Sequence, residues 1–229
     1  MIPIRDENPI QGIPYVTMGI IAINVLVYLY QLVLPAQQEL VFVYQYGVVP
    51  ALLTGSVAVP EPLAWLPQPL TLVTSVFLHG GFFHLAGNML YLWIFGNNIE
   101  DRLGPARFVV FYLLGGVLAS LAHVLAGPDS QLPMIGASGA IAAVLGAYFL
   151  LYPRANVVVL IWFFFFVQLI RVPAVIVLGV WFLFQVLGSG GPGVAWMAHI
   201  GGFVVGLVLI RFFLPPPGRP RRRGPRIVS

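Results

Sequence analysis

The sequence predicts an all-α membrane protein in which six transmembrane helices form a bundle and a long interfacial loop follows the first helix. Composition is the first observation behind this prediction. Hydrophobic residues make up 59% of the 229 positions, charged residues make up only 8%, and the mean hydropathy is +0.95. Soluble domains carry about a quarter charged residues, and a chain of 25 kDa cannot enclose this much apolar surface. The composition therefore excludes a soluble enzyme, a disordered chain and a nucleic-acid-binding protein.

The second observation is the length of the apolar segments. A spanning helix needs about 20 mostly apolar residues, and prolines, charges and glycine-rich turns divide the chain into six candidates. The expected spans are 15–34, 82–97, 107–125, 138–152, 173–187 and 196–214. Prolines interrupt the connection 35–81, so we expect short helical pieces in the membrane interface there. The aromatic stretch 157–167 is expected to dip into the inner interface.

The third observation is the position of the basic residues, all eleven of which are arginine. With six spans, every arginine falls on one side of the membrane, whereas a missed or extra span would scatter them over both. The positive-inside rule makes that side, with both termini, cytoplasmic. We therefore expect a cytoplasmic segment at 1–14, a six-helix domain at 15–214 and a basic Pro/Arg-rich cytoplasmic tail at 215–229. The chain has no cysteine, which excludes disulfides and thiolate chemistry.

Placing a polar side chain in the hydrocarbon core of a membrane costs free energy, so such residues indicate function by default. The expected spans contain few of them, among which are His84, Asn88, Ser120, His123, Ser138, Gln185 and His199. A rise of about 1.5 Å per residue places Ser138, His199 and His84 in one layer, roughly 18–21 Å above the inner ends of their helices. Serine and histidine at one depth indicate nucleophilic catalysis, in which the imidazole accepts the hydroxyl proton.

Small residues on two spans allow these two side chains to meet. They recur at i+4 spacing as Ser138, Ala142 and Gly146 in one span and as Ala198, Gly202 and Gly206 in the other. Such surfaces let helix backbones approach closely, although the same pattern is also how membrane helices pack without any catalytic role. No acidic residue is expected at this depth, so the residues favour a Ser-His dyad rather than a triad.

The remaining polar residues carry alternative interpretations. His84 and Asn88 share one helix face, and with the backbone N–H of Ser138 they could hold an oxyanion. Interhelical hydrogen bonding is the structural alternative for Asn88. Ser120 and His123 are interpreted as packing and interfacial residues. His79 could pack its loop or touch the site, and the structural interpretation is favoured.

Three segments resemble the signatures of the rhomboid intramembrane serine proteases. They read Gly-Ala-Ser-Gly-Ala at 136–140, His-Leu-Ala-Gly-Asn at 84–88 and Ala-His-Ile-Gly-Gly at 198–202, and the resemblance covers about residues 65–210. It implies that Ser138 is the nucleophile and His199 the general base, with His84 and Asn88 in the oxyanion hole. Three glycines are expected to support the site, namely Gly136 in the loop before Ser138 and Gly139 and Gly202 between the packed helices.

The resemblance also implies an activity, which is cleavage of single-span membrane-protein substrates in or near their transmembrane segments. No cofactor, metal ion or nucleic acid is expected; the lipid bilayer is the other partner. The six spans suggest the minimal bacterial form in the inner membrane, with the active site opening to the outer side and the fifth span acting as a gate. Ala142 stands where some relatives carry a tyrosine that stacks on the histidine, so other contacts must position His199.

Two other functions compete with this one. A non-catalytic rhomboid-like protein would bind or escort membrane proteins, but such proteins typically lose the serine or the histidine. A small transporter would use the polar layer as a solute path, but the chain lacks the inverted repeats and internal ion pairs expected there.

Overall fold

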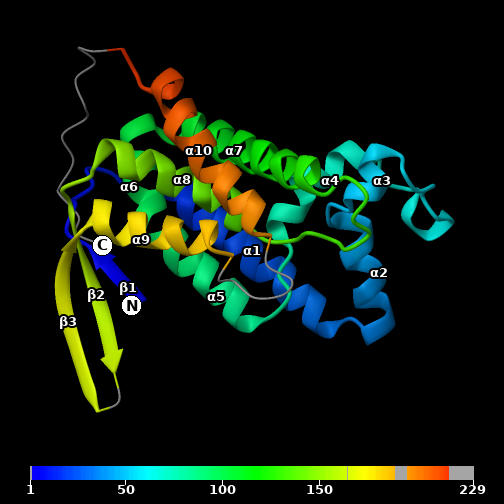
Figure 1. Cartoon of the computed structure of the whole chain (residues 1–229), viewed down its shortest axis with the longest axis horizontal. Helices are drawn as coiled ribbons and strands as arrows, with labels where there is room; N and C mark the ends of the chain where they lie inside the picture. The colour runs from blue at the N-terminus through cyan, green and yellow to red at the C-terminus, as the bar shows by residue number, and fades with distance from the viewer. Residues whose placement is uncertain (1, 164, 189–194, 217–229) are drawn as a thin grey trace.

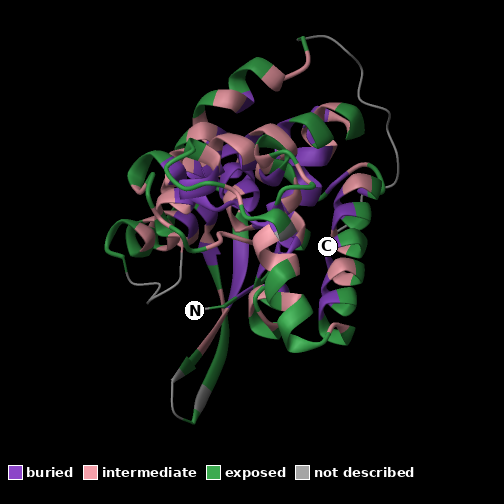
Figure 2. Ribbon diagram, turned by 90° about the vertical axis from the view of Figure 1, so that its right-hand side faces the viewer, coloured by how far each residue is buried: buried purple, intermediate pink, exposed green. Residues whose placement is uncertain are grey.

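The computed structural model describes residues 2–163, 165–188 and 195–216. Long helices run beside one another, a group of short helices lies at one end, and a small sheet lies at the other (Figure 1). Buried residues gather where the long helices meet (Figure 2). The helices are α1 (Tyr15–Val33), α2 (Ala36–Tyr46), α3 (Pro50–Thr54), α4 (Gln68–Thr74), α5 (Phe82–Tyr91), α6 (Asn97–Leu103), α7 (Pro105–Ala126), α8 (Ser138–Leu151), α9 (Ala174–Val186) and α10 (Trp196–Phe213).

Three helices of the described chain, α1, α7 and α10, are each long and apolar enough to cross a membrane. A fourth candidate is a pair bent by 83°, in which Gln68–Phe77 precedes Phe82–Leu103. The second member is one continuous helical segment because a π-helical turn at Leu92–Gly96 joins α5 to α6. The apolar helices α8 and α9 have only 14 and 13 residues. The bundle is therefore mostly helical as expected, and the count of six spans stays a prediction.

The connection 35–81 consists of short helical pieces, as its prolines predict. It contains α2, α3, α4 and two 3-10 turns at Glu61–Leu63 and Ser75–Phe77. Prolines occupy the first or second position of α3, of α4 and of the first of these turns, where a missing N–H costs nothing. Its placement in the membrane interface stays a prediction.

The all-α prediction is wrong at the end of the bundle, where three strands form an antiparallel sheet in the order β1-β2-β3. The strands are β1 (Ile2–Asp6), β2 (Asn156–Phe163) and β3 (Phe166–Pro173), so most of 157–167 belongs to a hairpin. Its placement in the inner interface stays a prediction. β-branched and aromatic residues, which fill this stretch, favour strands. One face of the hairpin joins the core through Val157, Val159 and Val172.

The hairpin extends across the helix axes, away from the bundle (Figures 1 and 2). Near its tip Trp162 is 73% exposed and Phe165 is 98% exposed. At its base, Arg171 donates a hydrogen bond of 2.7 Å to Glu7, which lowers the pKa of that carboxyl group. The sheet thus ties the start of the chain to the connection between α8 and α9.

Buried carboxylates near the sheet are satisfied by hydrogen bonds. Asp6 accepts from the hydroxyl of Tyr148 at 2.5 Å and from the side-chain amide of Asn98 at 2.9 Å. Glu100 accepts from the backbone N–H of Val16 at 2.9 Å and from both the N–H and the hydroxyl of Thr17 at 2.7 Å. The first N–H groups of a helix lack partners within that helix. Glu100 of α6 therefore caps the N-terminus of α1 and fixes α1 against α6.

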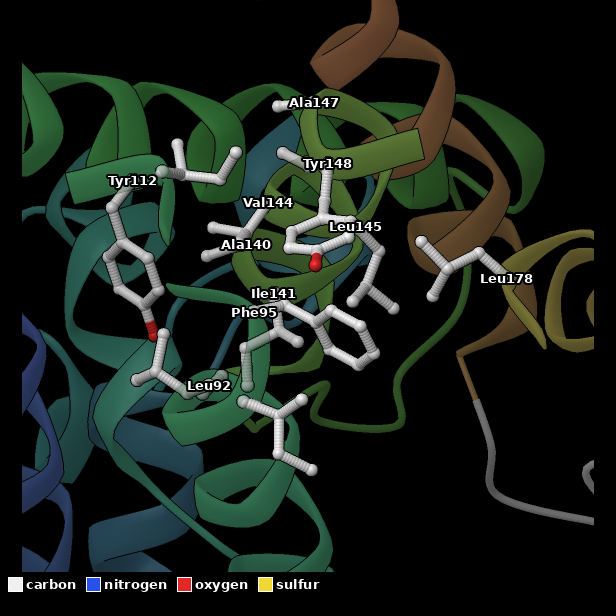
Figure 3. Packing of buried hydrophobic residues seen from close by; sticks show 14 of the residues in the cluster. Leu92, Phe95, Tyr112, Ala140, Ile141, Val144, Leu145, Ala147, Tyr148 and Leu178 are labelled. Atoms are coloured by element: carbon white, nitrogen blue, oxygen red, sulfur yellow. The ribbon is translucent and has the colours of Figure 1, made fainter. Parts of the chain in front are cut away.

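The core of the bundle is built around α8. Figure 3 shows Val144, Leu145 and Tyr148 of α8 at the centre, with Tyr112 of α7 on one side and Leu178 of α9 on the other. All five side chains are fully buried. A helix buried on all sides in this way has no lipid-facing stripe, which explains why α8 is apolar around its whole circumference.

Helices α8 and α10 touch backbone to backbone. A Cβ added to Gly146 would overlap the carbonyl oxygen of Phe203, and one added to Gly206 would overlap that of Ala143. A Cβ on Gly202 would overlap the carbonyl oxygen of Gly139. The small residues predicted to bring the two spans together therefore do so along most of their shared length.

Gly206→Ala is expected to destabilise the protein by about 3 kcal/mol, because overpacking at a rigid backbone contact forces the helices apart. The measurement is the free energy of unfolding in detergent micelles titrated with dodecyl sulfate. Gly19→Ala is the matched control, since a Cβ at this helical position of α1 has nothing within 4 Å. Equal unfolding free energies for both variants would contradict the close contact.

Candidate active site

Ser138 is the first residue of α8, and main-chain hydrogen bonds hold the loop that leads to it. Met134 exchanges hydrogen bonds of 2.7 and 3.0 Å with Val48, and the N–H of Gly136 donates to the carbonyl of Ser75 at 2.9 Å. Gly136 has a φ of +121°, a backbone conformation that residues other than glycine rarely adopt. The loop before α8 is thus anchored to the connection between α1 and α5, and this anchor sets where α8 begins.

The Ser138 hydroxyl and the His199 imidazole are hydrogen bonded. The distance between Ser138 Oγ and His199 Nε2 is 2.7 Å, and the two residues come from α8 and α10. Sequence reasoning predicted this pair from depth and from the small residues on both helices. The contact is short because the backbones of the two helices are in direct contact, as described above.

The other ring nitrogen of His199 faces a residue of α9. Gln185 Oε1 lies 2.7 Å from His199 Nδ1, and Gln185 Nε2 donates to the carbonyl of Trp181 at 3.3 Å. The Trp181 ring lies 5.9 Å from the imidazole, centroid to centroid. These are the contacts that replace the tyrosine absent at Ala142. Sequence reasoning noted Gln185 as a polar residue but assigned it no role, although its place one turn after Trp181, near the end of an expected span, was a usable signal.

His84 and Asn88 face Gly136 from α5. A Cβ on Gly136 would lie 2.7 Å from His84 Nε2 and 3.7 Å from Asn88 Nδ2. The backbone N–H of Gly80 lies 3.4 Å from His84 Nδ1, which leaves Nε2 of a neutral ring as the nitrogen that carries the proton. His84 and Asn88 therefore pack closely against the backbone of Gly136, where there is no room for a side chain.

His79 contacts this group as well. Asn88 Nδ2 lies 2.9 Å from His79 Nε2. The backbone of His79 is held by Gln31 of α1, whose Oε1 accepts from its N–H at 3.0 Å and whose Nε2 donates to its carbonyl at 3.2 Å. His79 is thus structural, as interpreted from the sequence, and it also fixes the side chain of Asn88.

Two cavities reach Ser138. The larger one has a volume of about 780 Å³ and lies under the loop before α8; its lining includes His84, Asn88, Ser138 and His199. The smaller one, of about 250 Å³, shares these four residues and is otherwise lined by α5, α8 and α9, including Tyr91 and Trp181. The predicted polar layer therefore borders two cavities.

The two polar residues of α7, Ser120 and His123, differ in their relation to this group. Ser120 is buried in α7 and lines neither cavity. His123 lines the larger cavity instead of serving only in packing. Within the described ranges, His, Asp and Glu side chains form no group of three that could hold a metal ion.

Comparison with known proteins identifies the family. The model of the Rhomboid domain matches residues 66–216, which is more than half of the chain. The chain therefore belongs to the rhomboid family, and it is an integral membrane protein, as its composition and its apolar helices predict. This confirms the resemblance found in the three signatures.

Curated relatives cover parts of the chain. It is 30% identical over 156 residues to "Rhomboid protein 1, mitochondrial" of Saccharomyces cerevisiae, covering 63% of this chain and 42% of that protein. It is 43% identical over 76 residues to "Rhomboid protease GluP" of Bacillus subtilis, which is 33% of this chain and 14% of that protein. It is 34% identical over 91 residues to "Presenilin-associated rhomboid-like protein, mitochondrial" of Mus musculus, which is 39% of this chain and 24% of that protein. The chain thus spans less than half the length of these three relatives.

Gly136→Ala is expected to slow the reaction of Ser138 with a fluorophosphonate probe by about 10- to 100-fold. A Cβ would press on His84 Nε2 at 2.7 Å, and the strained φ costs about 1–3 kcal/mol. The rate of covalent labelling of the folded, purified protein is the measurement. Gly127→Ala serves as the control, because a Cβ there has nothing within 4 Å. Equal labelling rates for the two variants would contradict the proposed crowding.

Proposed function

We propose that the protein is an intramembrane serine endopeptidase that hydrolyses peptide bonds in or near transmembrane segments of membrane-protein substrates. The observation that carries this proposal is the 2.7 Å hydrogen bond between Ser138 and His199 at the wall of a cavity, in a chain of the rhomboid family. A serine hydroxyl is a weak nucleophile unless an adjacent base takes its proton, and the imidazole is at the distance this requires.

The reaction follows from these two groups. His199 Nε2 takes the proton as Ser138 Oγ attacks the carbonyl carbon of the scissile peptide bond, which gives a tetrahedral oxyanion. The imidazolium then protonates the leaving nitrogen, the C–N bond breaks, and an acyl-enzyme with a Ser138 ester remains. A water molecule, deprotonated by the same imidazole, hydrolyses that ester and returns Ser138 to its hydroxyl form.

The oxyanion forms beside His84 and Asn88. Both side chains offer N–H donors at the wall of the cavities that reach Ser138, and the N–H of Ser138 begins α8, where the helix dipole favours negative charge. Donors that are already in place cost no reorganisation when charge develops. The hydrogen bond of Asn88 to His79 keeps that donor in position before substrate arrives.

Substrate geometry follows from membrane physics. A helix must unwind before a carbonyl within it is exposed, so single-span substrates with weak helical segments fit best. The smaller cavity, whose walls come partly from α5 and α9, is the lateral route for such a segment. Water reaches the site through the larger cavity.

The six-span topology belongs to the same proposal. The start of α7 and the ends of α8 and α10 all lie at the end of the molecule that carries the sheet (Figure 1), and arginines follow or precede these points in the sequence. With this end in the cytoplasm of a bacterial cell, both termini are internal, and Ser138 opens toward the outer side. The domain then comprises 15–214, between a short N-terminal segment and a basic tail.

A binding or escort function without catalysis is the alternative, since some relatives of the chain are named only as rhomboid-like. Such a protein needs the cavity but not the hydrogen bond between hydroxyl and imidazole. The geometry at Ser138 therefore favours the enzyme.

Wild-type protein in detergent is expected to cleave a fluorescently labelled single-span model substrate. Ser138→Ala or His199→Ala is expected to lower the rate of cleavage about 1,000-fold or more, because each substitution removes an essential member of the pair. Product formation on a gel measures this. Persistent cleavage by both variants would contradict the Ser-His dyad. A wild-type protein that binds the substrate without cleaving it would support the escort function.

Asn88→Ala is expected to lower kcat by about 100- to 1,000-fold with little change in KM, because an oxyanion donor acts mainly in the transition state. Steady-state kinetics on the same model substrate provide the measurement. Ser120→Ala, a buried serine on α7 away from both cavities, should retain wild-type kcat. A rise in KM alone at Asn88→Ala would show that Asn88 binds substrate rather than the oxyanion.

A further inference from the structure

Gln185 of α9 contacts the nitrogen of His199 that the proposed reaction does not use. We propose that Gln185 is a positioning residue that holds His199 in the tautomer able to accept the Ser138 proton, and that the reactivity of Ser138 therefore depends on the position of α9. This inference rests on the proposed function and adds a third member to a pair that lacks an acidic partner.

Hydrogen-bond chemistry fixes the orientation of the Gln185 amide. Its two ends face different groups, the carbonyl of Trp181 at 3.3 Å and His199 Nδ1 at 2.7 Å. A backbone carbonyl can only accept, so the NH₂ group must face Trp181. The amide oxygen therefore faces the imidazole, and a flipped amide would place two acceptors against each other.

The orientation of the amide then determines the tautomer of His199. An amide oxygen can only accept, so Nδ1 must carry the proton of the neutral ring. Nε2 is left with its lone pair, and it lies 2.7 Å from Ser138 Oγ. The hydroxyl thus donates to Nε2, which is the arrangement that proton transfer requires. With the other tautomer, Nε2 would carry a proton and Ser138 would have no base.

A neutral partner suits this place in the molecule. A carboxylate at membrane depth carries a large desolvation cost, whereas an amide oxygen orients the ring without bringing a charge. When the imidazolium forms, its Nδ1–H keeps the same acceptor. The Trp181 ring, 5.9 Å away, adds attraction for the cation. Trp181 and Gln185 stand at i and i+4, so both reach His199 from one face of α9.

The two halves of α9 are buried against the bundle to different extents. Its buried residues, Ala174 and Leu178, lie in the half nearest the sheet. In the half nearest the site, Leu183 and Val186 are more than half exposed, and the ring of Phe182 stacks on Phe203 at 4.6 Å. Displacement of this second half would separate Gln185 from His199 and leave the tautomer unspecified. Ser138 is consequently activated only while α9 is in place.

The test compares Gln185→Leu, which removes the acceptor, with Gln185→Glu, which keeps an oxygen at the same reach. Val186→Ala, the adjacent exposed position on α9, is the control. Kinetics on the single-span model substrate should show kcat about 10- to 100-fold lower for Gln185→Leu at unchanged KM. Gln185→Glu should recover most of the loss, and Val186→Ala should match the wild type.

A spectroscopic measurement separates positioning from general damage. The chain has four histidines, so ¹⁵N-histidine labelling in micelles gives few signals, and His199→Ala assigns those of His199. The wild type should show a protonated Nδ1 at His199, and Gln185→Leu should show a mixture of tautomers with the other three histidines unchanged.

The outcomes separate this inference from the proposed function. A wild-type protein that neither cleaves substrate nor labels with fluorophosphonate at Ser138 overturns the proposed function. An active wild type with unchanged kcat and unchanged His199 tautomer in Gln185→Leu overturns the positioning role alone. Loss of kcat in Gln185→Leu without recovery in Gln185→Glu, and with no change of tautomer, also overturns it.

Discussion

The contact between the backbones of α8 and α10 is the constraint on which the site depends. Lipid tails are as apolar as the helix surfaces, so no hydrophobic effect pushes helices together inside a bilayer, and close van der Waals contact must do so instead. Gly146, Gly202 and Gly206 provide this contact because they present no side chain at the crossing. With larger residues the helices would separate, and a hydrogen bond of 2.7 Å between Ser138 and His199 could not form.

Polar groups are distributed differently at the two ends of the bundle. Near the sheet, the buried carboxylates of Asp6 and Glu100 each accept several hydrogen bonds and link α1, α6 and α8. Around Ser138 the side chains are serine, histidine and amides, which need no charge at rest. Buried carboxylates with satisfied hydrogen bonds make the scaffold rigid, whereas the neutral groups around Ser138 bring no resting charge into the bundle.

The sequence predicted the helices and the central pair well, for identifiable reasons. The starts of α1, α8 and α10 follow turn residues and begin apolar segments, and the residue rise along α8 and α10 suffices to place Ser138 level with His199. The sheet could not be predicted, because a short continuous apolar run fits a strand or a buried helix equally well. The contact of Gln185 with His199 could not be predicted either. It depends on the rotation of α9 about its own axis, which the apolar residues all around that helix do not specify.

The pairing of β1 with β2 joins residues that are about 150 positions apart along the chain. During synthesis the first strand leaves the ribosome long before its partner exists, and contacts between such distant segments form late because closing a long loop costs entropy. Asp6 is fully buried in the folded protein, but its side chain cannot bind Tyr148 until that residue has been made. The sheet at the end of the bundle can consequently close only after the whole of α8 has been made.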